Sequence, residues 1–156
     1  MILSQEKIEN LLKEGFDVNT KDDFHDTLLH HAKNEDITQF LIKSGADVNI
    51  QNKTGYIPLH LAKTEGQVKA LISAGSKINV IDFYSGYTPL HLFCQKDFFE
   101  GIKLLLEAGA YVNVQNDGGN TPLHYATHNK IKKILIKFGA DTTIKNNLGE
   151  LHDNET

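Results

Sequence analysis

One four-residue motif recurs along the whole chain and constrains its fold more than any other feature. Its copies begin 30, 31 and 33 residues apart and occupy Thr27–His30, Ile57–His60, Thr88–His91 and Thr121–His124. A second motif, which begins with glycine, alternates with the first and occupies residues 15–19, 45–49, 75–79, 109–113 and 139–143. Two motifs in fixed alternation predict a repeat protein, in which stacked copies of one small unit share a continuous core.

The first motif indicates the start of a short helix. Proline is tolerated in the first turn of a helix, because the amide that it lacks would have no partner there. All three prolines of the chain stand in this motif, at Pro58, Pro89 and Pro122. The threonine that opens the motif in three copies can cap the helix, whereas Ile57 cannot. We therefore expect replacement of Ile57 with threonine to stabilise the protein by about 1 kcal/mol.

The second motif indicates the end of a longer helix. Aliphatic residues stand three and four positions before each of its glycines, as on one face of a helix. Glycine readily adopts the left-handed conformation in which many helices end. An extended stretch then leads to a β-turn before the next copy of the first motif. Each unit is predicted as helix, turn, helix, long loop and β-turn.

The two motifs, T-P-L-H and G-A-D-V-N, resemble those of the ankyrin repeat family from about Ile8 to Gly149. The resemblance implies an all-α solenoid of stacked helix-turn-helix units with protruding β-turns. It also implies that the histidines of the first motif bridge to neighbouring turns through hydrogen bonds. We predict a single domain over 1–156, with a half repeat at about 1–20, repeats at about 21–50, 51–80, 81–114 and 115–144, and a frayed tail at 145–156.

One repeat differs from the others in length. The histidine of the first motif lies 18 residues before the next glycine in the repeat 81–114, and 15 residues before it in the other three repeats. We expect the three missing residues to come from the turn between the two helices. The repeat 81–114 also has one extra residue before Thr88, and it carries Phe93 where the other copies carry alanine. We expect Phe93 to fill space left by the shorter neighbouring repeats.

The sequence favours no catalytic, cofactor or metal site, and we expect no enzyme activity. Cys94 is the only cysteine, so a cysteine-rich metal site is excluded and a buried, inert thiol is expected. The histidines that recur once per repeat are too far apart to share one ion. Weak metal candidates remain, and they are the pair His30 and His31, the pair His124 and His128, and His25 among Asp22, Asp23 and Asp26.

We predict a protein-interaction module whose partner, another protein, docks on the concave surface formed by the β-turns and the short helices. Aromatic residues carry much of the binding energy of interfaces, and turn tips are normally polar. The partner-binding residues that we expect are Tyr56, Phe83, Tyr84, Tyr87, Lys63 and Lys96. Phe83 and Tyr84 have an alternative, which is to fold down over the gap made by the shortened repeat. The lysines favour an acidic partner segment. A cytoplasmic monomer is expected, in its own cell or in one to which it is delivered.

Two other functions stay open at this point. The array could be the targeting portion of a larger effector enzyme, or it could bind phospholipid headgroups through Lys130, Lys132, Lys133 and Lys137. A membrane-spanning helix is not expected, because no stretch approaches about 20 consecutive apolar residues. The chain has no arginine and a net charge of -4, which disfavours nucleic-acid binding.

Overall fold

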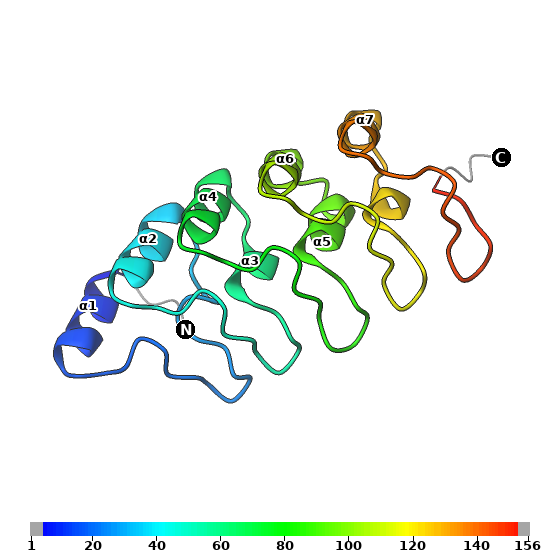
Figure 1. Cartoon of the computed structure of the whole chain (residues 1–156). Helices are drawn as coiled ribbons and strands as arrows, with labels where there is room; N and C mark the ends of the chain where they lie inside the picture. Colours follow the sequence, from blue (N-terminus) through cyan, green and yellow to red (C-terminus); the bar gives the residue numbers. More distant parts are fainter. Residues whose placement is uncertain (1–4, 153–156) are drawn as a thin grey trace.

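The computed structural model of the protein describes residues 5–152. Its longer helices form one row, the short helices form a second row beside it, and the β-turn loops project beyond the short helices (Figure 1). The longer helices are α1 (Gln5–Lys13), α2 (Glu35–Lys43), α4 (Glu65–Ser73), α6 (Phe99–Glu107) and α7 (Asn129–Lys137). The short ones are α3 (Pro58–Leu61), α5 (Pro89–Gln95) and the 3₁₀ helix η1 (Pro122–Tyr125). Residues 5–152 contain no strand, and the predicted all-α solenoid is confirmed.

The longer helices begin and end at the signals in the sequence. Asn34 caps α2 by accepting a hydrogen bond from the Ile37 amide at 3.0 Å, and Thr64 caps α4 through the Gln67 amide at 3.2 Å. The glycines that follow these helices have positive φ angles, such as 89° at Gly45. In α2, α4, α6 and α7 the leucine four positions before the glycine is buried in the core, as Leu41 is completely, whereas Ile136, three positions before Gly139, is 46% exposed.

The short helices account for the difference in length between repeats. α3 has four residues and α5 has seven, while the loop to the next long helix spans 62–64 in one repeat and 96–98 in the other. The three residues are therefore missing from the short helix, and the expectation that they come from the connecting turn is wrong. The first copy of the motif forms consecutive turns over 28–31 and no helix, and it is the copy that has leucine in place of proline.

The residue that opens the first motif faces the core in every copy, which changes the interpretation of Ile57. Its side chain is completely buried, and Thr88 is only 1% exposed. The Thr121 hydroxyl forms no capping bond with the backbone and donates instead to Nδ1 of His124 at 2.9 Å. Thr88 also accepts a capping hydrogen bond from the His91 amide, at 3.4 Å. Ile57 contributes apolar packing that threonine would remove, and this loss opposes the gain expected from capping.

The histidines of the first motif connect neighbouring repeats, as the family resemblance implied. Nε2 of His30 donates to the carbonyl of Tyr56 at 3.0 Å, and Nε2 of His91 donates to the carbonyl of Asn120 at 3.1 Å. In each case Nδ1 accepts from a backbone amide three residues earlier, which fixes the proton on Nε2. His124 follows the same pattern, with its Nε2 3.3 Å from the carbonyl of Glu150.

His60 is the exception among these four histidines. It is completely buried, and its Nε2 has no hydrogen-bond partner in residues 5–152. The next β-turn contains the extra residue. In this turn the Asp82 amide donates to the carbonyl of Tyr87, five positions further on. In the preceding turn the Asn52 amide donates to the carbonyl of Tyr56, only four positions further on. The Tyr87 carbonyl at the end of this wider turn lies near His60 but outside hydrogen-bond geometry with its Nε2.

Two further ladders of hydrogen bonds run along the array. Asparagine side chains bridge adjacent repeats, and Asn49, for example, donates to the carbonyl of Gly75 at 3.1 Å and accepts from the Lys77 amide at 2.8 Å. The tips of the β-turns are joined by backbone hydrogen bonds, in which an amide of one tip donates to a carbonyl of the preceding tip at 2.9–3.0 Å. The donating amides are those of Lys53, Phe83, Asp117 and Asn147. These ladders align the turns side by side.

Phe93 is part of the core and packs against residues of its own repeat, 81–114. Its ring is completely buried and lies 5.1 Å from the ring of Phe98. Both rings cover Gly101, where a Cβ atom would lie only 2.5 Å from Phe98 and 2.7 Å from Phe93. Cys94 is also completely buried, and burial raises the pKa of its thiol, so the side chain is packed in the core as a protonated thiol.

Candidate protein-interaction surface

Phe83 and Tyr84 form the tip of the β-turn 82–87 and are strongly exposed. Their exposed fractions are 62% and 74%. The Asp82 carboxylate accepts hydrogen bonds from three backbone amides of the turn, which fixes the loop that carries both rings. Phe83 also leans on the preceding turn, because its ring would lie 2.9 Å from a Cβ atom at Gly55. Phe83 therefore packs against its neighbour and still presents most of its surface to solvent.

Tyr56 and Tyr87 stand at the bases of two turns and pack partly against the core. The ring of Tyr56 stacks on His60 with ring centres 4.9 Å apart, and the Tyr87 hydroxyl lies 2.7 Å from that of Tyr125. Burial and this hydroxyl contact raise the pKa of Tyr87 to about 12. Both tyrosines are half-buried, so they contribute to the packing of the repeat as well as to its surface.

Lys63 and Lys96 follow the short helices α3 and α5. Both side chains are exposed, and neither pairs with a carboxylate of residues 5–152. Partial burial lowers the pKa of Lys96, and the positive charge of Lys63 lowers it further. The two ammonium groups are therefore close enough to repel each other, without a compensating negative charge from the described chain.

Two exposed apolar side chains extend this surface and were missed by sequence reasoning. Ile81 is 51% exposed and lies with Phe83 on the wall of a shallow hollow of about 650 Å³. Its position corresponds to Gln51 and Gln115 in the neighbouring repeats, so an aligned comparison of the repeats would have singled it out. Phe24, at the tip of the first turn, is 70% exposed.

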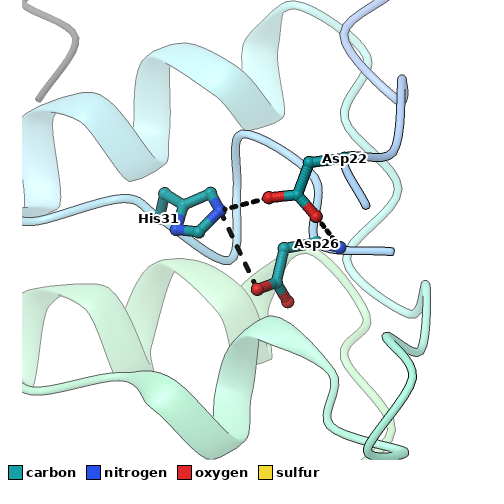
Figure 2. A group of neighbouring side chains, drawn as sticks. All are labelled: Asp22, Asp26 and His31. Carbon is teal, nitrogen blue, oxygen red and sulfur yellow. Dashed lines mark hydrogen bonds and ion pairs between the residues drawn. The ribbon is translucent and has the colours of Figure 1, made fainter. Parts of the chain in front are cut away.

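Among residues 5–152, the structure brings together one group of side chains that could hold a metal ion. Figure 2 shows Nε2 of His31 directed at the carboxylates of Asp22 and Asp26, at 3.1 Å and 3.8 Å. Sequence reasoning had grouped these acids with His25. His25 instead takes a left-handed conformation, with a φ angle of 61°, at the turn position where other copies have glycine.

The other histidine and lysine side chains considered as ligand-binding candidates each interact with a different partner. His124 and His128 do not share a helix, because η1 ends at Tyr125 and His128 precedes α7. His128 bonds to Asp97 at 2.8 Å, while His124 bonds to the carbonyl of Glu150. In the lysine group of α7, the ammonium of Lys130 lies 3.6 Å from the centre of the Phe99 ring. Phospholipid binding by this group stays a prediction.

The stacked fold and its two motifs define a repeat protein, and comparison with known families assigns it. The profile described as "Ankyrin repeats (3 copies)" matches residues 2–82 and 65–146. The chain belongs to the ankyrin repeat family. Proteins of this family are generally protein-interaction modules. None of the helices in the described residues has the length and apolar character needed to cross a membrane.

Similar proteins come from diverse organisms. A putative ankyrin repeat protein of Rickettsia felis is 40% identical over 76 residues, which are 42% of this chain and 34% of that protein. An ankyrin repeat-containing protein of Schizosaccharomyces pombe is 38% identical over 66 residues, 42% of this chain and 32% of that protein. Protein phosphatase 1 regulatory subunit 12A of Mus musculus is 38% identical over 69 residues, 42% of this chain and 7% of that protein. The chain spans about a third or less of the length of these relatives.

Proposed function

We propose that this chain is a non-catalytic interaction module that binds an acidic segment of a partner protein. The segment would lie across the turns 52–56 and 82–87 and the short helices that follow them, and the protein would act as a cytoplasmic monomer. The observation that carries the proposal is the combination of exposed aromatic rings at the turn tip with two unpaired lysines behind it. Relatives named as repeat or regulatory proteins agree with a binding role.

The spacing of these groups suits a short peptide. Tyr56 stands just before α3 and Lys63 just after it, and a helix of four residues spans about 6 Å at 1.5 Å per residue. The same order recurs with Tyr87, α5 and Lys96. An extended segment could therefore place an apolar side chain against the tyrosines and a carboxylate between the two lysines.

The positive charges of the two lysines favour an acidic partner segment. A carboxylate between Lys63 and Lys96 would relieve their mutual repulsion and favour the protonated form of Lys96. Phe83 and Tyr84 would add apolar contact, which is where most interfaces concentrate their binding energy. Binding should weaken as ionic strength rises, because the lysines are solvent-exposed.

The test first requires a partner, which an affinity capture from cell lysate followed by mass spectrometry would supply. Calorimetry with the purified partner would then compare the wild type with a Phe83→Ala, Tyr84→Ala variant and a Lys63→Gln, Lys96→Gln variant. We expect each double variant to bind at least about tenfold more weakly, and the lysine variant to lose most of its salt dependence.

The matched control is Tyr111→Ala. Tyr111 is also an exposed aromatic residue, at 67%, but it lies in the loop after α6 and outside the proposed surface. Its variant should bind like the wild type. If both double variants remain folded by circular dichroism and bind with unchanged affinity, the proposed surface is not the docking site.

A further inference from the structure

The cluster of Asp22, Asp26 and His31 has the composition and spacing of a metal-binding site. Each residue offers one ligand atom, and the three atoms all lie within 4.8 Å of one another (Figure 2). Asp22 and Asp26 come from the first β-turn, while His31 comes from the non-helical segment 28–31 that follows it.

In each carboxylate, one oxygen accepts hydrogen bonds from neighbouring residues and the other is directed at His31. Oδ1 of Asp22 accepts from the amides of Phe24 and Asp26, both at 2.9 Å. Oδ1 of Asp26 accepts from the side-chain amide of Asn52, in the next repeat, at 2.7 Å. Hydrogen bonds that orient metal ligands from outside the site raise metal affinity, and Asn52 is placed to act in this way.

A cavity of about 670 Å³ lies beside the cluster. Ile8 and Phe16 line it on the side of α1, and Leu28 lines it on the side of the segment 28–31. Lys21 and Lys33 also reach its wall. A metal ion held by three protein ligands would therefore have room for a water molecule or another ligand in its fourth position.

We propose that Asp22, Asp26 and His31 bind a divalent cation of the zinc type. One imidazole nitrogen and two carboxylate oxygens form a donor set that Zn²⁺ accepts. Zinc bonds of about 2.0–2.2 Å in a tetrahedron place neighbouring ligand atoms about 3.3–3.6 Å apart. The distances from Nε2 of His31 to the two carboxylates, 3.1 Å and 3.8 Å, are close to that value. The two carboxylates would also balance the charge of the ion.

The stacking of the repeats does not require this cluster. The residue at the position of Asp26 is Tyr56 or Tyr87 in the next two repeats, and the residue at the position of His31 is Leu61 or Leu92. The only other imidazole–carboxylate pair of residues 5–152 joins His128 to Asp97, with no second carboxylate at the imidazole. That pair provides an internal control for adventitious binding.

The experiment is a titration of the untagged full chain with Zn²⁺ at neutral pH, followed by calorimetry, and with Co²⁺, followed by visible absorption. We expect one saturable site with the absorption of four-coordinate cobalt. His31→Ala and Asp26→Asn should each weaken Zn²⁺ binding by at least about tenfold. His128→Ala should bind as the wild type does. Circular dichroism would establish that each variant is folded.

Two kinds of result would overturn the proposal. One is a wild-type chain that shows no saturable binding below millimolar Zn²⁺. The other is equal binding by the wild type and His31→Ala, or an equal loss in His128→Ala, either of which would indicate general adsorption to surface histidines.

Discussion

Removing Tyr84 should stabilise the protein, because it would return the turn 82–87 to the length of the other turns. In the five-residue turns 52–56 and 116–120, the carbonyl of the last residue lies 3.0 Å and 3.1 Å from Nε2 of the preceding histidine. In the longer turn the matching carbonyl, that of Tyr87, lies near His60 but outside hydrogen-bond geometry, so the buried Nε2–H has no partner in the described chain.

The expected gain follows from the state of His60. A buried donor without a partner costs about 1–3 kcal/mol. Tyr84 is 74% exposed, so its deletion sacrifices little buried surface. For a protein of this size, each kcal/mol corresponds to about 2–4 °C in Tm. The deletion variant should therefore melt several degrees above a reference variant, Tyr84→Ala, which removes the ring but keeps the length of the turn.

Thermal and urea denaturation of the two variants would measure this difference, and nuclear magnetic resonance would follow the imidazole N–H of His60. A new hydrogen bond should protect that proton from exchange with water. Equal or lower stability of the deletion variant, with the His60 proton unprotected, would refute the idea that turn length leaves the imidazole without a partner.

Two more predictions concern the same core. Ile57→Thr should leave the protein no more stable than the wild type, because the lost packing of about 1 kcal/mol offsets the possible cap. Ile57→Val should lower the stability by about 1 kcal/mol. Urea midpoints would measure both variants, and a clear gain for Ile57→Thr would contradict the argument. Burial lowers the pKa of His60 and of His91 to about 4 each, below the usual 6.5, so the unfolded chain binds protons that the folded chain excludes. Stability should fall from pH 6.5 towards 4, by roughly 2 kcal/mol per histidine at pH 5 relative to pH 7, and a urea midpoint that is equal at pH 5 and pH 7 would argue against it.

The features that could be predicted from the sequence are those that every repeat needs. Glycine after each long helix and the histidine bridges follow from demands that recur in each unit. The bridges of His30, His91 and His124 were expected from the resemblance to the ankyrin repeat family. Local departures were harder, because their effect depends on the neighbouring repeat. The missing partner of His60, for example, coincides with one extra residue more than twenty positions further along the chain.

The candidate sites were predicted less completely, because side-chain exposure depends on packing between turns. Phe83 and Tyr84 were expected at a turn tip and lie there. Tyr56 stacks on a histidine that the sequence does not place beside it. His31, which contacts Asp22, lies in a segment that was expected to be helical and is not.

In the backbone ladder along the turn tips, folding depends on main-chain groups and recognition depends on side chains. Because Lys53, Phe83, Asp117 and Asn147 each contribute a main-chain amide to it, side chains as different as lysine and phenylalanine serve equally at that position. A mutation at a tip can therefore alter what the surface recognises with little cost to folding. Such an array can acquire a new partner one side chain at a time, and its binding specificity can diverge while its architecture remains the same.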